Sequence, residues 1–212
     1  MTPTKPALRG HFHQAMFFVV VGAGVPLIYN SQGLLVRASV GVYVVCALLT
    51  FGISALYHRI TWSTEARAIW RKLDHAVIYL MIAGTFTPVA MLGLDAASAR
   101  SCLMTIWVVA LAGIVQSIFF VDIPKVFSAA IYLVAGYLIV PYVGELQRSI
   151  GSGNLWLLVA GGVAYTLGAL CYALKRPALD PRRFGYHEVF HILVNVGAIL
   201  HFFAINDLVF SG

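Results

Sequence analysis

Charged residues are scarce in this 212-residue chain: Asp, Glu, Lys and Arg make up 10% of it, whereas hydrophobic residues make up 60%. A soluble domain has about one-quarter charged residues. So few polar groups cannot cover the apolar surface of a folded chain, and we expect lipid to surround it. In lipid every backbone N–H and C=O group must be paired internally, which leaves helices or a closed barrel. The apolar runs are too long and too little alternated for barrel strands, so they favour an all-α integral membrane protein.

Cysteine and membrane-embedded lysine are also scarce. The three cysteines, Cys46, Cys102 and Cys171, are odd in number and lie inside apolar runs, so we interpret them as small core residues. No lysine lies within an apolar run, which excludes a retinal Schiff base. The net charge of +6 is spread over short connections, which favours contact with membrane lipids and argues against a nucleic-acid partner.

The apolar runs of membrane-spanning length are seven in number, and the connections between them are short. We predict a seven-transmembrane-helix bundle that forms a single domain over residues 1–212. Glycines inside the runs are expected where helices approach closely: Gly22, Gly24, Gly161, Gly162 and Gly168. The predicted spans are 12–29, 38–58, 73–94, 101–121, 126–143, 154–174 and 187–210.

The distribution of Lys and Arg predicts the orientation, because short connections rich in these residues stay in the cytoplasm. Three of the 14, Arg37, Arg100 and Arg148, fall on one side of the predicted membrane, and eleven fall on the other. The N-terminus is therefore predicted to be cytoplasmic and the C-terminus extracytoplasmic, in the plasma (inner) membrane. A cleaved signal peptide is the alternative for the first run, but no A-x-A-like site follows it. The eleven are Lys5, Arg9, Arg59, Arg67, Arg71, Lys72, Lys125, Lys175, Arg176, Arg182 and Arg183.

Ionisable residues inside membrane spans are costly, and here they gather at the cytoplasmic ends of three runs. The second run ends in the segment 54–58, the third begins at 73–75, and the seventh begins at 187–191. Residues four apart share a helix face, so Ser54 lies over His58. His187 lies over His191 in the same way. Three helices can therefore bring these groups to one level of the bundle.

Three neutral imidazoles with an open fourth position are what a catalytic zinc site requires. The candidate ligands are His58, His187 and His191. Asp74 is the candidate proton acceptor, placed either beside the bound water or behind a ligating imidazole. The alternative is that these side chains only line a wet helix boundary as hydrogen-bonded polar groups.

Two other catalytic interpretations remain open. The segment 187–191 also reads H-E-x-x-H, the zincin pattern, in which Glu188 would be the general base of a peptidase. The extended pattern would require Gly at 194 and His at 197, where this chain has Val194 and Gly197. A metal-free triad of Ser54, His58 and Asp74 is the other interpretation, and it leaves the two histidines of the seventh run unused.

The motifs resemble those of a known family. In order they are Ser-Ala-Leu-Tyr-His at 54–58, Leu-Asp-His at 73–75 followed by Ala-Gly-Thr-Phe-Thr-Pro at 83–88, and His-Glu-Val-Phe-His at 187–191. Together they resemble the bacterial hemolysin III family, the prokaryotic branch of the progestin and adipoQ receptor (PAQR) family, within the CREST superfamily of metal-dependent membrane hydrolases. The resemblance covers nearly the whole chain.

The resemblance implies a zinc ion (Zn2+) held by His58, His187 and His191, with Ser54 and Asp74 matching the Ser and Asp of the family. It also implies seven spans with a cytoplasmic N-terminus. The superfamily includes alkaline ceramidases and is regarded as acting on lipid amides, and the bacterial branch is linked to membrane-lipid homeostasis.

We therefore expect a zinc-dependent hydrolase of a lipid amide or ester, working from the cytoplasmic leaflet. In this enzyme Asp74 would accept a proton and Ser54 would steady the water or the oxyanion. The expected partners are membrane lipids, including a lipid substrate. The alternatives are a non-catalytic lipid-sensing protein with a structural zinc site and a pore-forming haemolysin.

Overall fold

Helices make up almost all of the described chain, as backbone hydrogen bonding in lipid requires. The computed structural model describes residues 6–180 and 182–211, so Lys5 of the charge distribution lies outside the described residues. Over these residues there is no strand, and an isolated bridge joins Asp180 and Phe184. The predicted all-α class is confirmed. The elements are α1 (His11–Asn30), α2 (Leu34–Arg59), α3 (Thr64–Gly93), α4 (Ala96–Phe119), α5 (Lys125–Gly136), the 3-10 helix η1 (Tyr137–Tyr142), α6 (Val143–Leu174) and α7 (Tyr186–Ser211).

Six helical stretches are long and apolar enough to cross a membrane. Five of them are single helices. The sixth is the 50-residue stretch Lys125–Leu174, which contains α5, η1 and α6. Gly151 interrupts this stretch with a non-helical φ of 75° and ψ of 164°. A glycine suits that position because a side chain is strained at positive φ.

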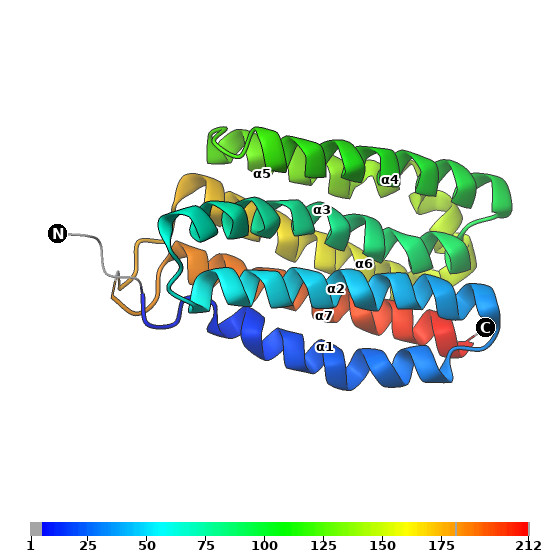
Figure 1. Cartoon of the computed structure of the whole chain (residues 1–212). Coiled ribbons are helices and arrows are strands. Elements are labelled where there is room, and N and C mark those ends of the chain that lie inside the picture. The colour runs from blue at the N-terminus through cyan, green and yellow to red at the C-terminus, as the bar shows by residue number, and fades with distance from the viewer. Residues whose placement is uncertain (1–5, 181, 212) are drawn as a thin grey trace.

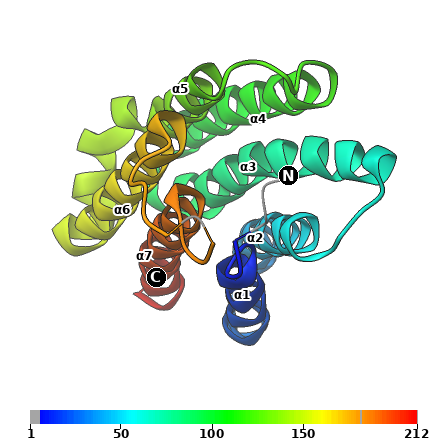
Figure 2. The same cartoon turned by 90° about the vertical axis from the view of Figure 1, so that its left-hand side faces the viewer.

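The helices run side by side along one axis (Figure 1). Helices that are neighbours in sequence pack against each other, and α7 also contacts α1 and α3. Viewed from the end at which α1 and α7 begin, they form a closed arrangement in which the last helix returns to the first (Figure 2). The beginnings of α1, α3 and α7 and the end of α2 therefore meet at one end of the bundle.

Several helices begin earlier than the predicted spans, and in two of them, α3 and α4, a polar residue caps the start. The side chain of Ser63 accepts a hydrogen bond from Ala66 N, so α3 begins at Thr64 and includes the charged segment ahead of residue 73. Asp95 caps α4 by accepting from the backbone N–H groups of Ala97 and Ser98. The Ser98 and Ala97 amides hold the pKa of the Asp95 carboxyl below its usual range. Hydropathy marks the part of a helix that lies in lipid, whereas caps mark where the helix begins.

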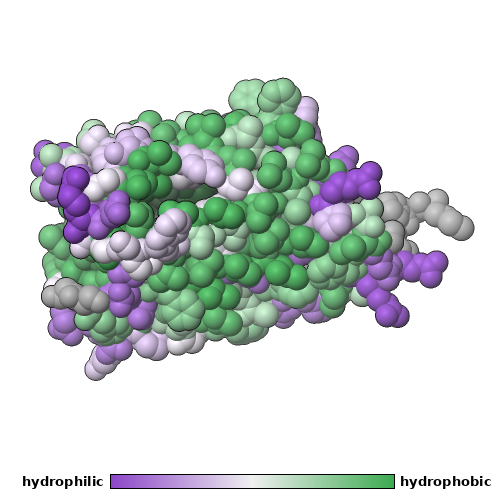
Figure 3. Space-filling view, turned by 180° about the vertical axis from the view of Figure 1, so that it is seen from behind, coloured by the Kyte–Doolittle hydropathy of each residue, from purple (hydrophilic) through white to green (hydrophobic). Residues whose placement is uncertain are grey.

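The surface has a broad hydrophobic band between hydrophilic ends, as the face in Figure 3 shows. Among the predicted close-approach glycines, a Cβ on Gly24 would lie 2.7 Å from Val44 and one on Gly161 would lie 2.2 Å from His201, whereas one on Gly168 would make a less severe but still tight contact, 3.3 Å from Leu193 Cβ. Gly22 and Gly162 face open space within the described structure. Cys46 and Cys102 are buried and Cys171 is partly buried, and all three are free thiols.

Candidate metal centre

The start of α7 is fixed by Glu188. Its Oε2 accepts a hydrogen bond from Gly185 N at 2.8 Å, which satisfies an N–H group at the helix N-terminus, and its Oε1 pairs with the Arg9 guanidinium. Both carboxylate oxygens are therefore engaged away from the histidines. This arrangement argues against Glu188 as the general base of a zincin.

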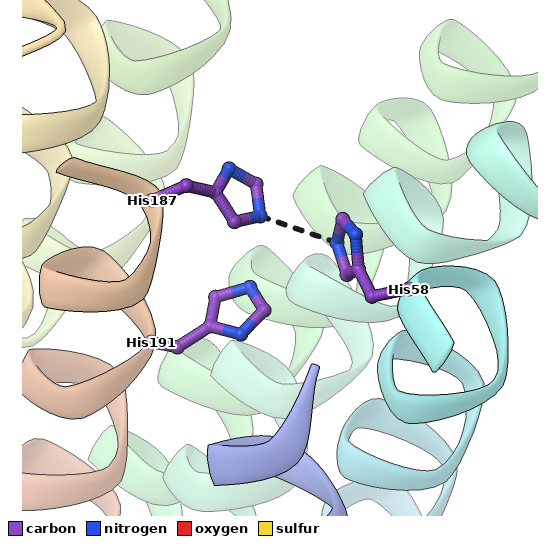
Figure 4. Close-up of side chains that lie close together, drawn as sticks. All are labelled: His58, His187 and His191. Atoms are coloured by element: carbon purple, nitrogen blue, oxygen red, sulfur yellow. Dashed lines mark hydrogen bonds between the residues drawn. The ribbon is translucent and has the colours of Figure 1, made fainter. Parts of the chain in front are cut away.

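Helix α7 presents His187 and His191 on one face, and both imidazoles point toward His58 at the end of α2 (Figure 4). All three side chains are buried. His187 Nε2 lies 3.2 Å from His58 Nε2. One ligand atom from each residue can be chosen so that all three lie within 4.8 Å of one another. The structure therefore brings together the three residues that the sequence nominated as metal ligands.

The donor set fits a metal ion such as zinc. Tetrahedral zinc with Zn–N bonds of about 2.0–2.1 Å requires nitrogens separated by about 3.3 Å. The separation of 3.2 Å between His58 Nε2 and His187 Nε2 matches this requirement. Two buried imidazole nitrogens that face each other have few ways to be satisfied, and a shared cation is one of them.

Asp74 borders the same space from α3. Its Oδ2 lies 3.4 Å from His58 Nε2, the nitrogen that also faces His187. The carboxylate is therefore beside the nitrogen cluster and does not lie behind the His58 ring. Of the two positions that the sequence left open for Asp74, this one suits a proton acceptor.

Ser54 is bonded to a residue that the sequence analysis missed. Its Oγ lies 2.9 Å from His13 Nδ1 on α1. The His13 ring in turn stacks on His191, with ring centroids 3.7 Å apart and planes at 4°. Among the described residues, His13 Nε2 is buried without a hydrogen-bond partner. Ser54 therefore bonds to His13, whereas the predicted triad needs Ser54 to bond to His58, and within the described part of the chain His13 has no acid on its second nitrogen with which to replace His58. This geometry argues against the triad of Ser54, His58 and Asp74.

Helix α1 is held over the site by several contacts. Gly10 precedes it with φ of 82°, and a Cβ there would lie 2.7 Å from His58 Cβ, so the missing side chain allows α1 to approach His58 closely. Asn195 Nδ2 on α7 donates to Phe12 O at 2.9 Å. Arg9 pairs with Glu188. His13 is an ionisable residue inside the first predicted span, 12–29, which is the sequence signal that could have revealed this face.

Two further histidines lie apart from the cluster. His75 Nδ1 lies 3.3 Å from the hydroxyl of Tyr132 on α5. His201 Nε2 bonds to Leu158 O at 3.0 Å. Neither residue belongs to the group of three that could hold a metal ion.

A cavity of about 180 Å³ begins at the cluster and continues into the bundle. At the cluster end its lining includes His13, Ser54, Asp74 and His191. Beyond them the lining is largely apolar, with contributions from α3, α5, α6 and α7. A polar, metal-competent end joined to an apolar cavity is suited to a lipid whose polar group is the one that reacts.

Comparison with known proteins identifies the relationship of the chain. The profile of the family described as Haemolysin-III related matches residues 1–202. The chain belongs to this family. It is 33% identical to the hemolysin-3 homolog of Bacillus subtilis over 164 residues, which cover 77% of this chain and 74% of the relative. Haemolysin-III membership and six apolar helices together make it a multi-pass membrane protein.

More distant relatives connect the haemolysin-III family to the PAQR receptors. The adiponectin receptor protein of Drosophila melanogaster is 27% identical over 190 residues, which cover 79% of this chain and 42% of the relative. The human monocyte to macrophage differentiation factor is 27% identical over 164 residues, which cover 76% of this chain and 65% of the relative. The resemblance drawn from the motifs is confirmed at the level of the family.

Proposed function

We propose that this haemolysin-III related protein is a zinc-dependent hydrolase of a lipid amide or ester, located in the plasma membrane and acting at the cytoplasmic leaflet. The observation that carries the proposal is the buried cluster of His58, His187 and His191, with Asp74 beside it, at the end of an apolar cavity. Burying polar groups together within apolar helices costs free energy, so such a cluster is a candidate functional site.

The three histidines would hold the ion. Neutral imidazoles from two helices suit zinc, and three protein ligands leave a fourth position open. Zinc bound there would lower the pKa of a coordinated water toward about 7, which supplies a nucleophile for carbonyl chemistry.

Asp74 and Ser54 would complete the chemistry. The water that attacks the carbonyl carbon would pass a proton to Asp74 Oδ2, and Asp74 would return it to the leaving nitrogen or oxygen as the C–N or C–O bond breaks. The products are a fatty acid and an amine or alcohol. When His13 carries its proton on Nδ1 it donates to Ser54 Oγ. The Ser54 hydroxyl is then free to donate to the developing oxyanion.

We further propose that the chain crosses the membrane seven times as a single domain, with the N-terminus in the cytoplasm and the C-terminus outside. A straight helix of 50 residues would be about 75 Å long, far more than the roughly 30 Å of a bilayer core. The stretch Lys125–Leu174 is broken at Gly151, and α5 packs against α6. Two antiparallel passes account for both features.

The test is to measure the zinc content of the purified protein and then to incubate the protein with a lipid library. Mass spectrometry of released fatty acids is the readout, and Asp74→Asn at equal zinc content is the control. We expect the parent protein to release a fatty acid from an amide or ester, and we expect Asp74→Asn to release none. Bound zinc without release from any lipid would instead favour the lipid-sensing alternative with a structural metal.

A further inference from the structure

Two buried polar atoms belong to residues that line the cavity far from the histidine cluster. They are His201 Nδ1 on α7 and the Tyr165 hydroxyl on α6, and both residues belong to the cavity lining. Neither atom has a hydrogen-bond partner within residues 6–180 and 182–211. A buried polar atom without a partner costs about 1–3 kcal/mol. Two such atoms beside a largely apolar part of the cavity therefore point to a ligand group.

Two glycines seat these side chains. A Cβ on Gly161 of α6 would lie 2.2 Å from the His201 ring, and a Cβ on Gly197 of α7 would lie 2.8 Å from the Tyr165 ring. Each helix therefore has a glycine where the ring from the other helix packs against its backbone. The two rings pack edge to face with centroids 5.4 Å apart. The positions of both polar atoms are set by this reciprocal packing of α6 and α7.

The hydrogen bonding of His201 and Tyr165 limits which ligand group can pair with both of their free polar atoms. A backbone carbonyl only accepts, so the 3.0 Å bond to Leu158 O places the His201 proton on Nε2. Nδ1 is then an acceptor and requires a donor from the ligand. The Tyr165 hydroxyl can donate to the same ligand group. A hydroxyl both donates and accepts, whereas a carbonyl could satisfy only Tyr165.

The position of the pair along the cavity sets where the hydroxyl must lie. His201 is ten residues beyond His191, which is about 15 Å along α7. Carbon–carbon bonds are about 1.5 Å long, so an extended zigzag chain needs roughly a dozen carbons to cover this distance. We infer that the cavity selects an acyl chain with a mid-chain hydroxyl, which donates to His201 Nδ1 and accepts from Tyr165. This inference rests on the proposed function only in placing the carbonyl at the histidine cluster.

Binding to the purified protein tests the inference without requiring turnover. The probes are octadecanoic acid, its derivative hydroxylated at the twelfth carbon and its derivative hydroxylated at the second carbon, each measured by native mass spectrometry from detergent. We expect the mid-chain hydroxy acid to bind about tenfold more tightly than the other two, as two added hydrogen bonds would give. Equal binding of all three acids would overturn the inference, and this comparison needs no variant.

Tyr165→Phe removes the hydroxyl and keeps the ring, so it should abolish the preference for the mid-chain hydroxy acid. The matched control is Tyr79→Phe, since Tyr79 is fully buried but lies outside the cavity lining. This variant should keep the preference of the parent protein for the mid-chain hydroxy acid. A preference that survives in Tyr165→Phe would overturn the assignment. Hydrolysis without a hydroxyl preference would refute this inference alone, whereas selective binding without hydrolysis of any lipid would refute only the proposed enzyme.

Discussion

At the scale of single residues, one atom, His58 Nε2, lies close to both another histidine nitrogen and the Asp74 carboxylate. His58 Nε2 faces both His187 Nε2, at 3.2 Å, and Asp74 Oδ2, at 3.4 Å. A carboxylate behind a ligand would instead bond to the far nitrogen of the ring and orient it. In this protein the His191 ring stacks on His13, and Asp74 faces the same side of His58 as His187 does.

Replacing a proposed ligand should release the metal. We expect about one zinc per parent chain and well under half of that in His58→Ala, His187→Ala or His191→Ala, because two imidazoles cannot complete the site. Elemental analysis of the purified variants measures this. His75→Ala is the matched control, since His75 bonds to Tyr132 outside the cluster, and it should retain zinc. Full zinc retention in the double variant His187→Ala/His191→Ala would reject the ligand set.

The roles of Asp74 and Ser54 can be separated by kinetics at constant zinc content. Asp74→Asn should keep the metal and lose roughly 10²–10⁴-fold in rate, because an amide cannot accept the proton. Ser54→Ala should lose roughly 10²–10³-fold, as expected for one oxyanion donor. If Ser54 were the nucleophile, intact-protein mass spectrometry of samples quenched during turnover would reveal an acyl adduct on Ser54. Such an adduct, together with activity that survives zinc removal, would contradict the proposed mechanism.

At the scale of helices, the site depends on the docking of α1 against α7. The Asn195 bond to Phe12 O joins the two helices, and the His13–His191 stack lies between them. The Arg9–Glu188 ion pair ties the segment just ahead of α1 to α7. Glu188 is 2% exposed, so its charge depends on Arg9 and on the Gly185 amide for stabilisation. Removal of one partner from a buried pair leaves an uncompensated charge.

The Arg9–Glu188 pair should matter for stability and not for metal ligation. Arg9→Gln should destabilise the protein by about 3–5 kcal/mol, because it leaves the Glu188 carboxylate buried without its cation. Glu188→Gln should cost less, since glutamine can still bond to the Gly185 amide. Thermal unfolding in detergent, with zinc analysis in parallel, tests both changes. Loss of zinc from Glu188→Gln without a lower unfolding temperature would instead make Glu188 part of the metal site.

The same helices show which parts of the site were predictable from sequence. The four-residue spacing within 54–58 and 187–191 predicted which side chains share a face, and the structure brings His58, His187 and His191 together. It did not predict that α1 would supply His13. A helical pattern identifies the polar face of a helix, but which helix that face meets depends on the packing of the whole bundle. The early start of α3 was missed for a different reason, since its first turns are charged and only the Ser63 cap marks them.

At the scale of the whole molecule, the site and the charge asymmetry coincide. The beginnings of α1, α3 and α7 and the end of α2 meet at one end of the bundle, where the histidine cluster lies (Figures 1 and 4). The same end carries ten of the eleven basic residues assigned to the cytoplasm, all of them within the described residues. If these residues face the cytoplasm, the polar end of the cavity lies at the inner leaflet.

Cysteine labelling can test both the orientation and the number of passes. In a chain whose three cysteines are replaced by alanine, single cysteines at the exposed positions Thr61 and Arg183 should react with an impermeant maleimide only after the membrane is permeabilised. Single cysteines at the exposed positions Gln32, on the connection between α1 and α2, and Ser152, next to the break in α6 at Gly151, should react in intact cells.

The position of Arg183 decides whether the stretch Lys125–Leu174 crosses the membrane once or twice. With a cytoplasmic N-terminus, two passes return the chain to the cytoplasm before Arg183, whereas one pass would leave Arg183 outside. Labelling of the cysteine at Arg183 in intact cells, with Thr61 protected, would therefore contradict the seven-pass topology while keeping the orientation. Labelling at both Thr61 and Arg183, with Gln32 and Ser152 protected, would invert the molecule and move the histidine cluster to the outer leaflet.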